Sequence, residues 1–182
     1  MIFFVSIGAY CFEISKPRIF FDRNNYSVLV IVFVEGSPPR RLDDILKRNF
    51  SVEFTLELNF IRKDFGVFNI QTVITNIKTR YSISYDIVSG KYITSNPFTF
   101  RTYDNFEDVI DGLSPFFQRI DLKSFKGNPD FEEIYEDTEF FITSKARITY
   151  INLKPPLSII TSLIGFGNYE TPTTVSDTFR IR

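Results

Sequence analysis

Carboxylates are the side chains of this sequence that could do chemistry, and they are densest near position 130. This run contains six acidic residues: Asp130, Glu132, Glu133, Glu136, Asp137 and Glu139. Oxygen ligands of this kind could hold calcium or attract a basic partner. The spacing of an EF-hand is absent, however, and a run of acids is also typical of a solvated surface. Both interpretations stay open, and we assign no metal ligand.

Three other carboxylates have a spacing or a setting that suggests a role. Glu53 and Glu57 share one face of a predicted strand, and acid/base pairs of glycosidases can lie at such separations. Many solvent-exposed pairs do so as well. Asp86 enters a predicted turn, where a carboxylate can accept backbone N–H bonds and fix the strand register. We therefore predict a structural role for Asp86 and assign no catalytic residue.

The composition excludes several classes of function. The sequence has no histidine, which removes the commonest general base and the commonest metal ligand. It has neither of the glycine-rich patterns that bind nucleotide phosphates. The 21 Lys and Arg residues against 22 Asp and Glu give a formal net charge of −1, without the basic excess of nucleic-acid binders. We expect no enzyme, no cofactor and no nucleic-acid partner.

The N-terminus carries an apolar run over Ile2 to Phe12. Its length fits the h-region of a secretory signal and is too short to span a bilayer. Because no positive residues precede it, residues 1–16 are predicted to be either a truncated signal segment or an N-terminal strand. Cys11 is either acylated as a lipid anchor or a small buried or discarded thiol. We expect an exported protein, periplasmic or envelope-associated, with membrane association through the N-terminus.

In several long segments, apolar and polar residues alternate with a period of two, as they do in half-buried strands. These strands must position the side chains described above. One strand is predicted over residues 50–62 and a hairpin at Ser89–Gly90 leads back into residues 91–94. Further strands are predicted over residues 26–34, 140–150 and 175–181. A second long strand is predicted after a turn at Lys63–Asp64. One face of this strand is predicted to carry Val73, Ile77, Tyr81, Ile83 and Tyr85.

Two short helices are predicted, at about residues 41–49 and 105–119. The first has apolar residues at helical spacing, and Asn49 is expected to end it by adopting the left-handed backbone conformation. The second has Asp104 as its expected N-cap, with Pro115 limiting or kinking it. Many strands, few helices and no βαβ rhythm favour a mainly β fold, an antiparallel β-sandwich-like domain over residues 17–182.

One hairpin carries a family resemblance. Tyr81, Tyr85 and Asp86, followed by Gly90 and Tyr92, resemble the "YxLxYD…Y" hairpin of the bacterial family catalogued as domain of unknown function 4390. The order of the helices and strands from about Tyr26 onward is similar too. The resemblance implies a small exported bacterial protein, in some cases encoded near a sensor histidine kinase, with no established catalytic residue. The hairpin residues are accordingly expected to be structural.

An apolar stretch over residues 157–166 follows Pro155–Pro156. It either completes the core or docks a partner. The candidate partner-binding residues are Leu157, Ile160, Leu163, Ile164 and Phe166. From these features we predict a non-enzymatic module that binds an envelope protein, with a link to sensing. The alternative is a β-sandwich that binds a small ligand or lipid in an incompletely packed interior.

Overall fold

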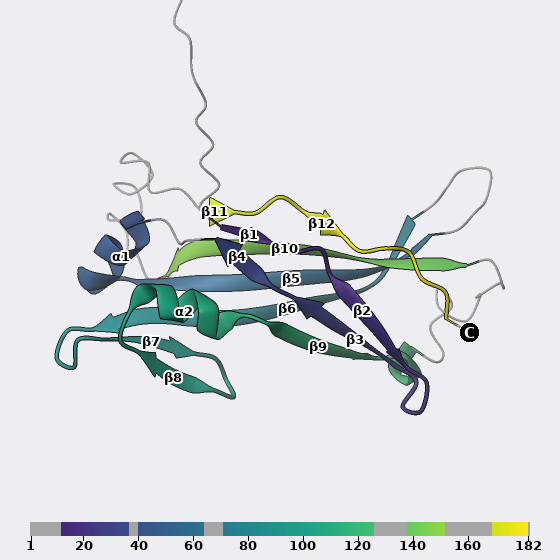
Figure 1. Ribbon diagram of the computed structural model, residues 1–182, viewed down its shortest axis with the longest axis horizontal. Coiled ribbons are helices and arrows are strands. Elements are labelled where there is room, and N and C mark those ends of the chain that lie inside the picture. Colours follow the sequence, from purple (N-terminus) through teal and green to yellow (C-terminus); the bar gives the residue numbers. More distant parts are fainter. Residues whose placement is uncertain (1–11, 37–39, 64–70, 126–137, 152–168, 182) are drawn as a thin grey trace, which may run out of the picture.

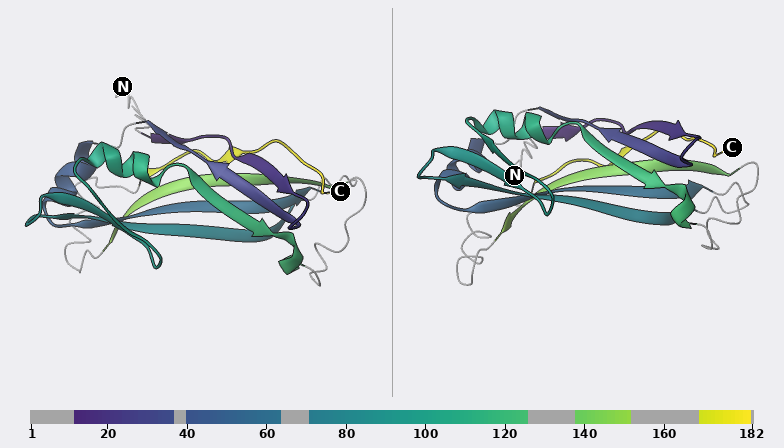
Figure 2. Two further views of the ribbon diagram at one scale, coloured as in Figure 1. Left: turned by 60° about the horizontal axis from the view of Figure 1, so that its bottom comes forward. Right: turned by 90° about the horizontal axis from the view of Figure 1, so that it is seen from below.

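The fold is mainly β and consists of two layers of antiparallel strands, which confirms the predicted sandwich-like architecture (Figure 1). The computed structural model describes residues 12–36, 40–63, 71–125, 138–151 and 169–181. Two short helices lie toward one end of the layers, as Figure 2 shows from two further sides. None of the helices within the described residues is both long and apolar enough to cross a membrane.

The larger layer is built around three long strands. They are β5 (Ser51–Lys63), β6 (Gln71–Asp86) and β10 (Glu139–Ile151). Beyond β6 the sheet continues into β7 (Lys91–Ser95) and β8 (Phe100–Tyr103). Beyond β10, the short strands β11 (Tyr169–Glu170) and β12 (Thr174–Val175) pair with its other edge.

The second layer has three strands in the order β2-β3-β9, with the bounds Arg18–Asp22, Ser27–Val32 and Phe116–Asp121. Beside them β1 (Phe12–Ile14) pairs with β4 (Val34–Gly36). Residues 12–14 of the predicted signal-or-strand segment therefore form a strand, whereas residues 1–11 lie outside the described residues.

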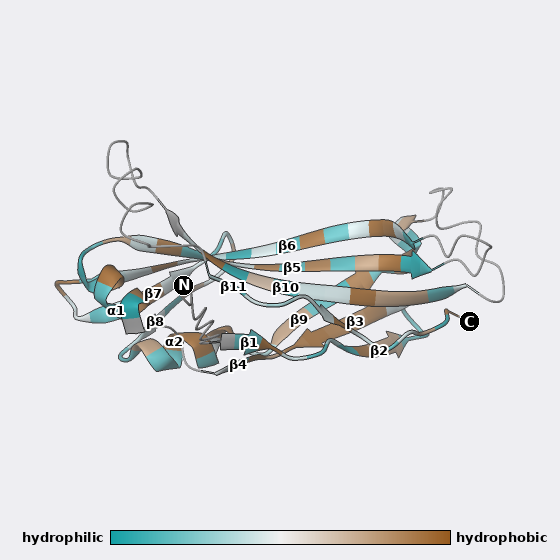
Figure 3. Ribbon diagram, turned by 90° about the horizontal axis from the view of Figure 1, so that it is seen from above, coloured by the Kyte–Doolittle hydropathy of each residue, from teal (hydrophilic) through white to brown (hydrophobic). Residues whose placement is uncertain are grey.

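The core lies between the layers and follows the predicted alternation. On β5 the inward side chains from Val52 to Phe60 are buried, and the residues between them are half-buried. Figure 3 shows hydrophobic and hydrophilic residues following one another along the long strands. Phe54 stacks on Phe116 of the other layer, with ring centroids 5.4 Å apart. Phe60 stacks on Phe140 at 5.2 Å. The Phe54–Phe116 pair joins the two layers, whereas Phe60 and Phe140 lie on neighbouring strands of the larger sheet. Both pairs stabilise the core, because burying a ring removes a large apolar area from water.

Both predicted helices exist, but the second is shorter than predicted. Helix α1 spans Arg40–Lys47, and Asn49 has the expected left-handed conformation, with a φ of 67°. Helix α2 spans Phe106–Leu113 instead of 105–119, because Ser114 is extended and Pro115 follows it. Residues 116–121 form strand β9. The N-cap residue is Asn105 and not Asp104.

Two strand predictions also need correction. A β-bulge in β6 lies between the pairs Phe60↔Thr75 and Ile61↔Val73, so Ile74 has no opposite residue. The bulge turns Val73 to the outer face, where it is 55% exposed, while Ile74 is buried. The predicted strand over residues 175–181 is reduced to β12 and one isolated bridge between Phe140 and Phe179.

Candidate functional site

Helix α2 packs on β7 and β8, which form a meander with β6, and its buried residues are Phe106, Val109, Ile110 and Leu113. Below it, Tyr85, Tyr92 and Tyr103 lie opposite one another on the three successive strands. The ring centroids of Tyr85 and Tyr92 are 4.9 Å apart, and Tyr92 is 5.6 Å from Phe106. The helix thus covers a layer of tyrosines, and one pocket lies at each of its ends.

The turn between β6 and β7 is fixed by Asp86. Its carboxylate accepts hydrogen bonds from the backbone N–H of Val88 (3.0 Å) and from the Ser89 hydroxyl (2.6 Å). These bonds, that of Ser89 first, lower the pKa of Asp86 below its ordinary value. Gly90 has a φ of +67°, a conformation that glycine adopts without strain. The residues of the predicted hairpin therefore hold the turn.

The pocket at the N-terminal end of α2 is polar, and we call it the tyrosine–carboxylate pocket. Its volume is about 520 Å³. Three elements meet around it: helix α1, the β6–β7 hairpin and the start of α2. The lining residues are Asp43, Asp44, Lys47, Tyr85, Gly90, Tyr92, Asp104, Asn105, Phe106 and Glu107.

A hydrogen-bonded triad forms one wall of this pocket. The Tyr92 hydroxyl donates to Asp43 Oδ1, and Lys47 Nζ donates to Asp43 Oδ2 at 2.8 Å. Burial, followed by the bond to Asp43, raises the pKa of Tyr92 to about 12. The bond to Asp43 raises the pKa of Lys47 as well. Both groups therefore hold their protons firmly at neutral pH.

The pocket carries an excess of negative charge. Four carboxylates line it against one cation, Lys47. Of these, Asp43 is engaged in the triad, and Asp104 lies 3.3 Å from Lys91 Nζ. The other two, Asp44 and Glu107, are exposed. A cationic group would therefore be attracted to this end of the molecule.

Comparison with known proteins found no relative. No family model matches the chain, and no curated protein or solved structure matches it either. The resemblance to the family of domain of unknown function 4390 therefore stays a prediction.

The other carboxylates that the sequence analysis considered are held in ion pairs on exposed surfaces. Glu53 and Glu57 lie on the outer face of β5, 4.0 Å from Arg80 and 3.5 Å from Lys78, respectively. Glu139 pairs with Arg180 at 3.3 Å. Among the described residues, no group of three or more His, Cys, Asp or Glu is arranged to hold a metal.

Several predicted features lie outside the described residues. They are Cys11, the acidic residues 130–137 and the candidate docking residues Leu157, Ile160, Leu163, Ile164 and Phe166. Of the predicted hairpin residues, Tyr85, Gly90 and Tyr92 line the tyrosine–carboxylate pocket and Asp86 holds the turn beside it. Tyr81 lies further along β6 and lines the pocket at the other end of α2.

Sequence reasoning missed Asp43 and Lys47. A signal was present, because the two residues are four positions apart on α1, away from the buried Leu42 and Leu46. That spacing predicts an ion pair on the helix surface. It does not reveal that Tyr92, 49 positions along the chain, joins the pair.

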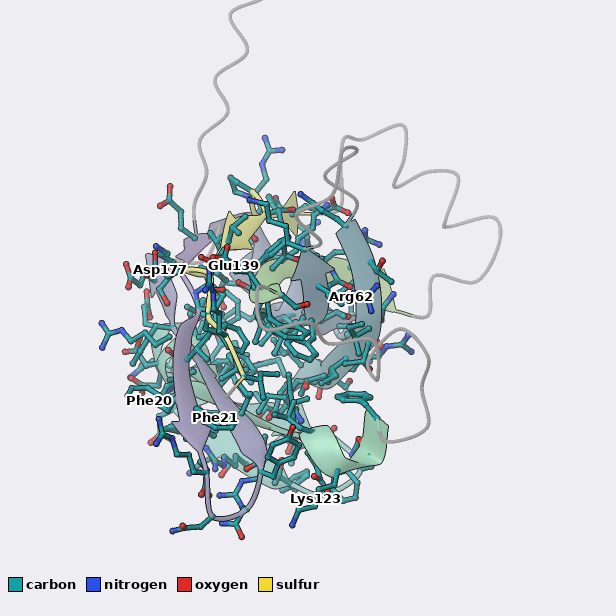
Figure 4. All side chains as sticks on the ribbon, turned by 90° about the vertical axis from the view of Figure 1, so that its right-hand side faces the viewer. Phe20, Phe21, Arg62, Lys123, Glu139 and Asp177 are labelled. Atoms are coloured by element: carbon teal, nitrogen blue, oxygen red, sulfur yellow. The ribbon has the colours of Figure 1, made fainter. Side chains whose placement is uncertain are left out.

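A further pocket, of about 640 Å³, lies at the end of the molecule opposite α1 (Figure 4). Phe20, 53% exposed, lies on β2 beside it. Lys16 Nζ is 2.5 Å from Asp177 Oδ1, and the Arg18 guanidinium lies 5.0 Å from the centroid of the Phe33 ring. Since these charged groups are already engaged within the chain, we assign no ligand to this pocket.

Proposed function

We propose that this chain is a non-enzymatic protein-binding module, and that it contacts its partner through the β6–β7 turn and the tyrosine–carboxylate pocket. The observation that carries this proposal is the exposure of Val88 and Ile87, 97% and 62%, on the turn beside the pocket. Exposed apolar side chains that project from a fixed backbone are typical of binding anchors.

The turn is preorganised for binding. Asp86 accepts two hydrogen bonds within it, and the N–H of Gly90 donates to the carbonyl of Asp86 at 2.8 Å. A partner that buries Val88 therefore does not also have to order the backbone, which reduces the entropic cost of binding.

The charge of the pocket defines the chemistry of the partner. Four carboxylates and two tyrosine rings beside an apolar turn suit a segment with a basic side chain next to an apolar one. A lysine or arginine side chain would pair with Asp44 or Glu107 and contact the face of Tyr85. Such pairing is screened by salt, so we expect binding to weaken as the ionic strength rises.

The pKa values support binding over catalysis at this site. A general base or a nucleophile works best when its pKa lies near the working pH. The pKa values of Tyr92 and Lys47 are shifted upward, away from neutrality. The hydrogen bonds to Asp43 contribute to both shifts, as expected of a structural wall in which each donor keeps its proton.

The proposal is tested by quantitative crosslinking pull-down from the native host. One variant removes the apolar turn (Ile87→Ser with Val88→Ser), and a second removes charge (Asp44→Asn with Glu107→Gln). Matched controls are Phe20→Ser, which is exposed at the opposite end, and Glu13→Gln with Glu35→Gln, exposed residues of β1 and β4. We expect one envelope protein to be enriched by the native chain and both controls, and to be lost with both site variants.

Three outcomes would contradict the proposal. Equal recovery of the partner with native chain and site variants would place the interface elsewhere. Enrichment of no protein above a mock bait would argue against a protein-binding role. If a substrate is turned over in a broad hydrolase screen and Asp43→Asn abolishes the turnover, the protein is an enzyme.

We also propose an envelope location, with membrane association through the N-terminus. The support is the apolar run over Ile2 to Phe12, which is a feature of the sequence. Fractionation of the host that expresses the full-length gene product tests it. Recovery in the envelope fractions is expected, and recovery in the cytoplasm alone would contradict it.

A further inference from the structure

The second pocket of α2 lies at its C-terminal end, between the two layers, and we call it the β8–β9 pocket. Its volume is about 260 Å³. The larger sheet supplies residues of β5, β6, β7 and β8, and the other side is formed by the end of α2 and the start of β9 (Figure 1). The lining residues are Leu56, Leu58, Thr79, Tyr81, Thr94, Thr99, Arg101, Tyr103, Gly112, Leu113, Pro115, Phe116, Phe117 and Gln118.

The β8–β9 pocket has an apolar floor and a charged lining residue, Arg101. Leu56 and Leu58 are almost fully buried beneath the pocket, and Tyr81 and Phe116 contact each other edge to face at 5.9 Å. Threonine hydroxyls lie on the side of β6 and β7. Arg101 is the one charged residue among the described lining residues, so the charge of this pocket is opposite to that of the tyrosine–carboxylate pocket.

Arg101 and Tyr103 converge on Gly112. Arg101 Nη1 donates to the carbonyl oxygen of Gly112 at 3.3 Å. A Cβ at Gly112 would lie 2.3 Å from the Tyr103 hydroxyl oxygen, which shows how closely that hydroxyl approaches the helix backbone. Within the described structure the Tyr103 hydroxyl is buried without a hydrogen-bond partner, and Arg101 has no acidic partner.

The buried Tyr103 hydroxyl is unfavourable without a partner, because it has lost water without gaining an acceptor. Beside it, the exposed guanidinium of Arg101 donates to a neutral carbonyl and has no acidic partner among the described residues. Both groups are donors, and both are satisfied by one carboxylate. The guanidinium has five N–H groups and can bind a carboxylate through two of them.

We propose that the β8–β9 pocket binds a small monocarboxylate with an apolar body. The carboxylate accepts from Arg101, which turns from the Gly112 carbonyl, and from the Tyr103 hydroxyl, which lines the same pocket. The apolar body lies on Leu56, Leu58 and Phe116. The pocket is slightly smaller than the range of roughly 300–1,000 Å³ that is usual for drug-sized ligands, so a medium-chain acid suits it better than a long-chain lipid.

The test is an amide-resolved NMR titration of the full chain with sodium octanoate. Octanol and octylamine are the matched probes, since they have the same chain length without the negative charge. We expect saturable shifts at Thr79, Thr99 and Gly112 with octanoate, and binding of the other two probes that is weaker by about tenfold or more, as the loss of a charge-assisted hydrogen bond implies.

Two substitutions and one control assign the contacts. Arg101→Gln removes the charge, and we expect about a tenfold loss of octanoate affinity. Tyr103→Phe removes one oxygen, and we expect a several-fold loss with an unchanged or higher melting temperature. Arg119→Gln, an exposed β9 arginine that lies 3.8 Å from Asp22, should bind octanoate like the native chain. If Arg101→Gln does not fold, Tyr103→Phe still tests the site.

The proposal is overturned if octanol binds as tightly as octanoate, if the shifts lie outside the pocket, or if both Arg101→Gln and Tyr103→Phe keep the native affinity. Its outcome is independent of partner binding, because Arg101 and Tyr103 do not line the tyrosine–carboxylate pocket. Arg101→Gln should therefore still enrich the partner in the pull-down.

Discussion

The hydroxyl group of Tyr92 donates a hydrogen bond to the carboxylate of Asp43 and so joins strand β7 to helix α1. The two residues are 49 positions apart in the chain. Tyr92 is almost fully buried, while Lys47 occupies the other carboxylate oxygen on the solvent side. One side chain of the larger sheet thus fixes the position of the helix that borders the tyrosine–carboxylate pocket.

The first prediction concerns this bond. Tyr92→Phe should lower the free energy of unfolding by about 1–3 kcal/mol, as expected for a buried hydrogen bond to a charged group. Chemical denaturation at pH 7 measures the change. In a double-mutant cycle with Asp43→Asn, the two effects should be clearly non-additive, whereas additive effects would show that the bond contributes nothing.

The same bond predicts a dependence on alkaline pH. The pKa of Tyr92 is raised from 10.0 to about 12 in the folded chain, so the folded state keeps its proton longer than the unfolded state. The stabilisation is complete below pH 10 and is lost as the pH rises through 12. The stability difference between the native chain and Tyr92→Phe should therefore shrink between these values.

Asp86 gives the opposite pH dependence. Its lowered pKa means that the folded turn favours the charged carboxylate, so its contribution is present above the ordinary value of 3.8 and is lost as the pH falls through the folded value. Asp86→Asn should lower the melting temperature at pH 7, and this difference should disappear in acid. In Ser89→Ala, NMR titration should find the pKa of Asp86 closer to 3.8, because the largest cause of the shift is gone. An unchanged pKa would contradict this assignment.

Replacing Gly112 by alanine should destabilise the chain, although alanine usually stabilises a helix relative to glycine. Alanine normally stabilises a helix interior by up to about 1 kcal/mol relative to glycine. Here the new Cβ would meet the Tyr103 ring at 2.3–2.6 Å, so we expect Gly112→Ala to destabilise the chain by about 1–3 kcal/mol. The penalty should fall in a Tyr103→Ala background, which removes the ring. A stabilising Gly112→Ala would show that the ring moves freely.

The bulge in β6 distinguishes two neighbouring residues. Ile74 is buried and Val73 is exposed, against the alternation of the rest of the strand. Ile74→Ala should cost about 2–5 kcal/mol, whereas Val73→Ala should change stability by about 0.5 kcal/mol or less. Denaturant unfolding of the two variants measures both effects. A larger cost at Val73 would place the bulge elsewhere.

The sequence determined the strands and their inward faces where the period of two is unbroken. The inward side chains from Val52 to Phe60, together with Phe140, Ile142 and Ile148, are buried as predicted. The same holds for the end of α1, since Asn49 adopts the left-handed conformation that its position implies. These features could be predicted because alternation and local backbone preference involve only neighbouring residues.

Tertiary structure alone decided the rest. Three features depend on which strand lies alongside: the bulge at Ile74, the strand conformation of residues 116–119, which were predicted to be helical, and the reduction of the C-terminal strand. The candidate sites depend on it too: Asp43 meets Tyr92, and Arg101 meets Gly112, only through the packing of helices on the meander. The physical reason is that periodicity specifies which face of an element is buried, whereas the partner of that face, and the pockets left between partners, are set by contacts between distant segments.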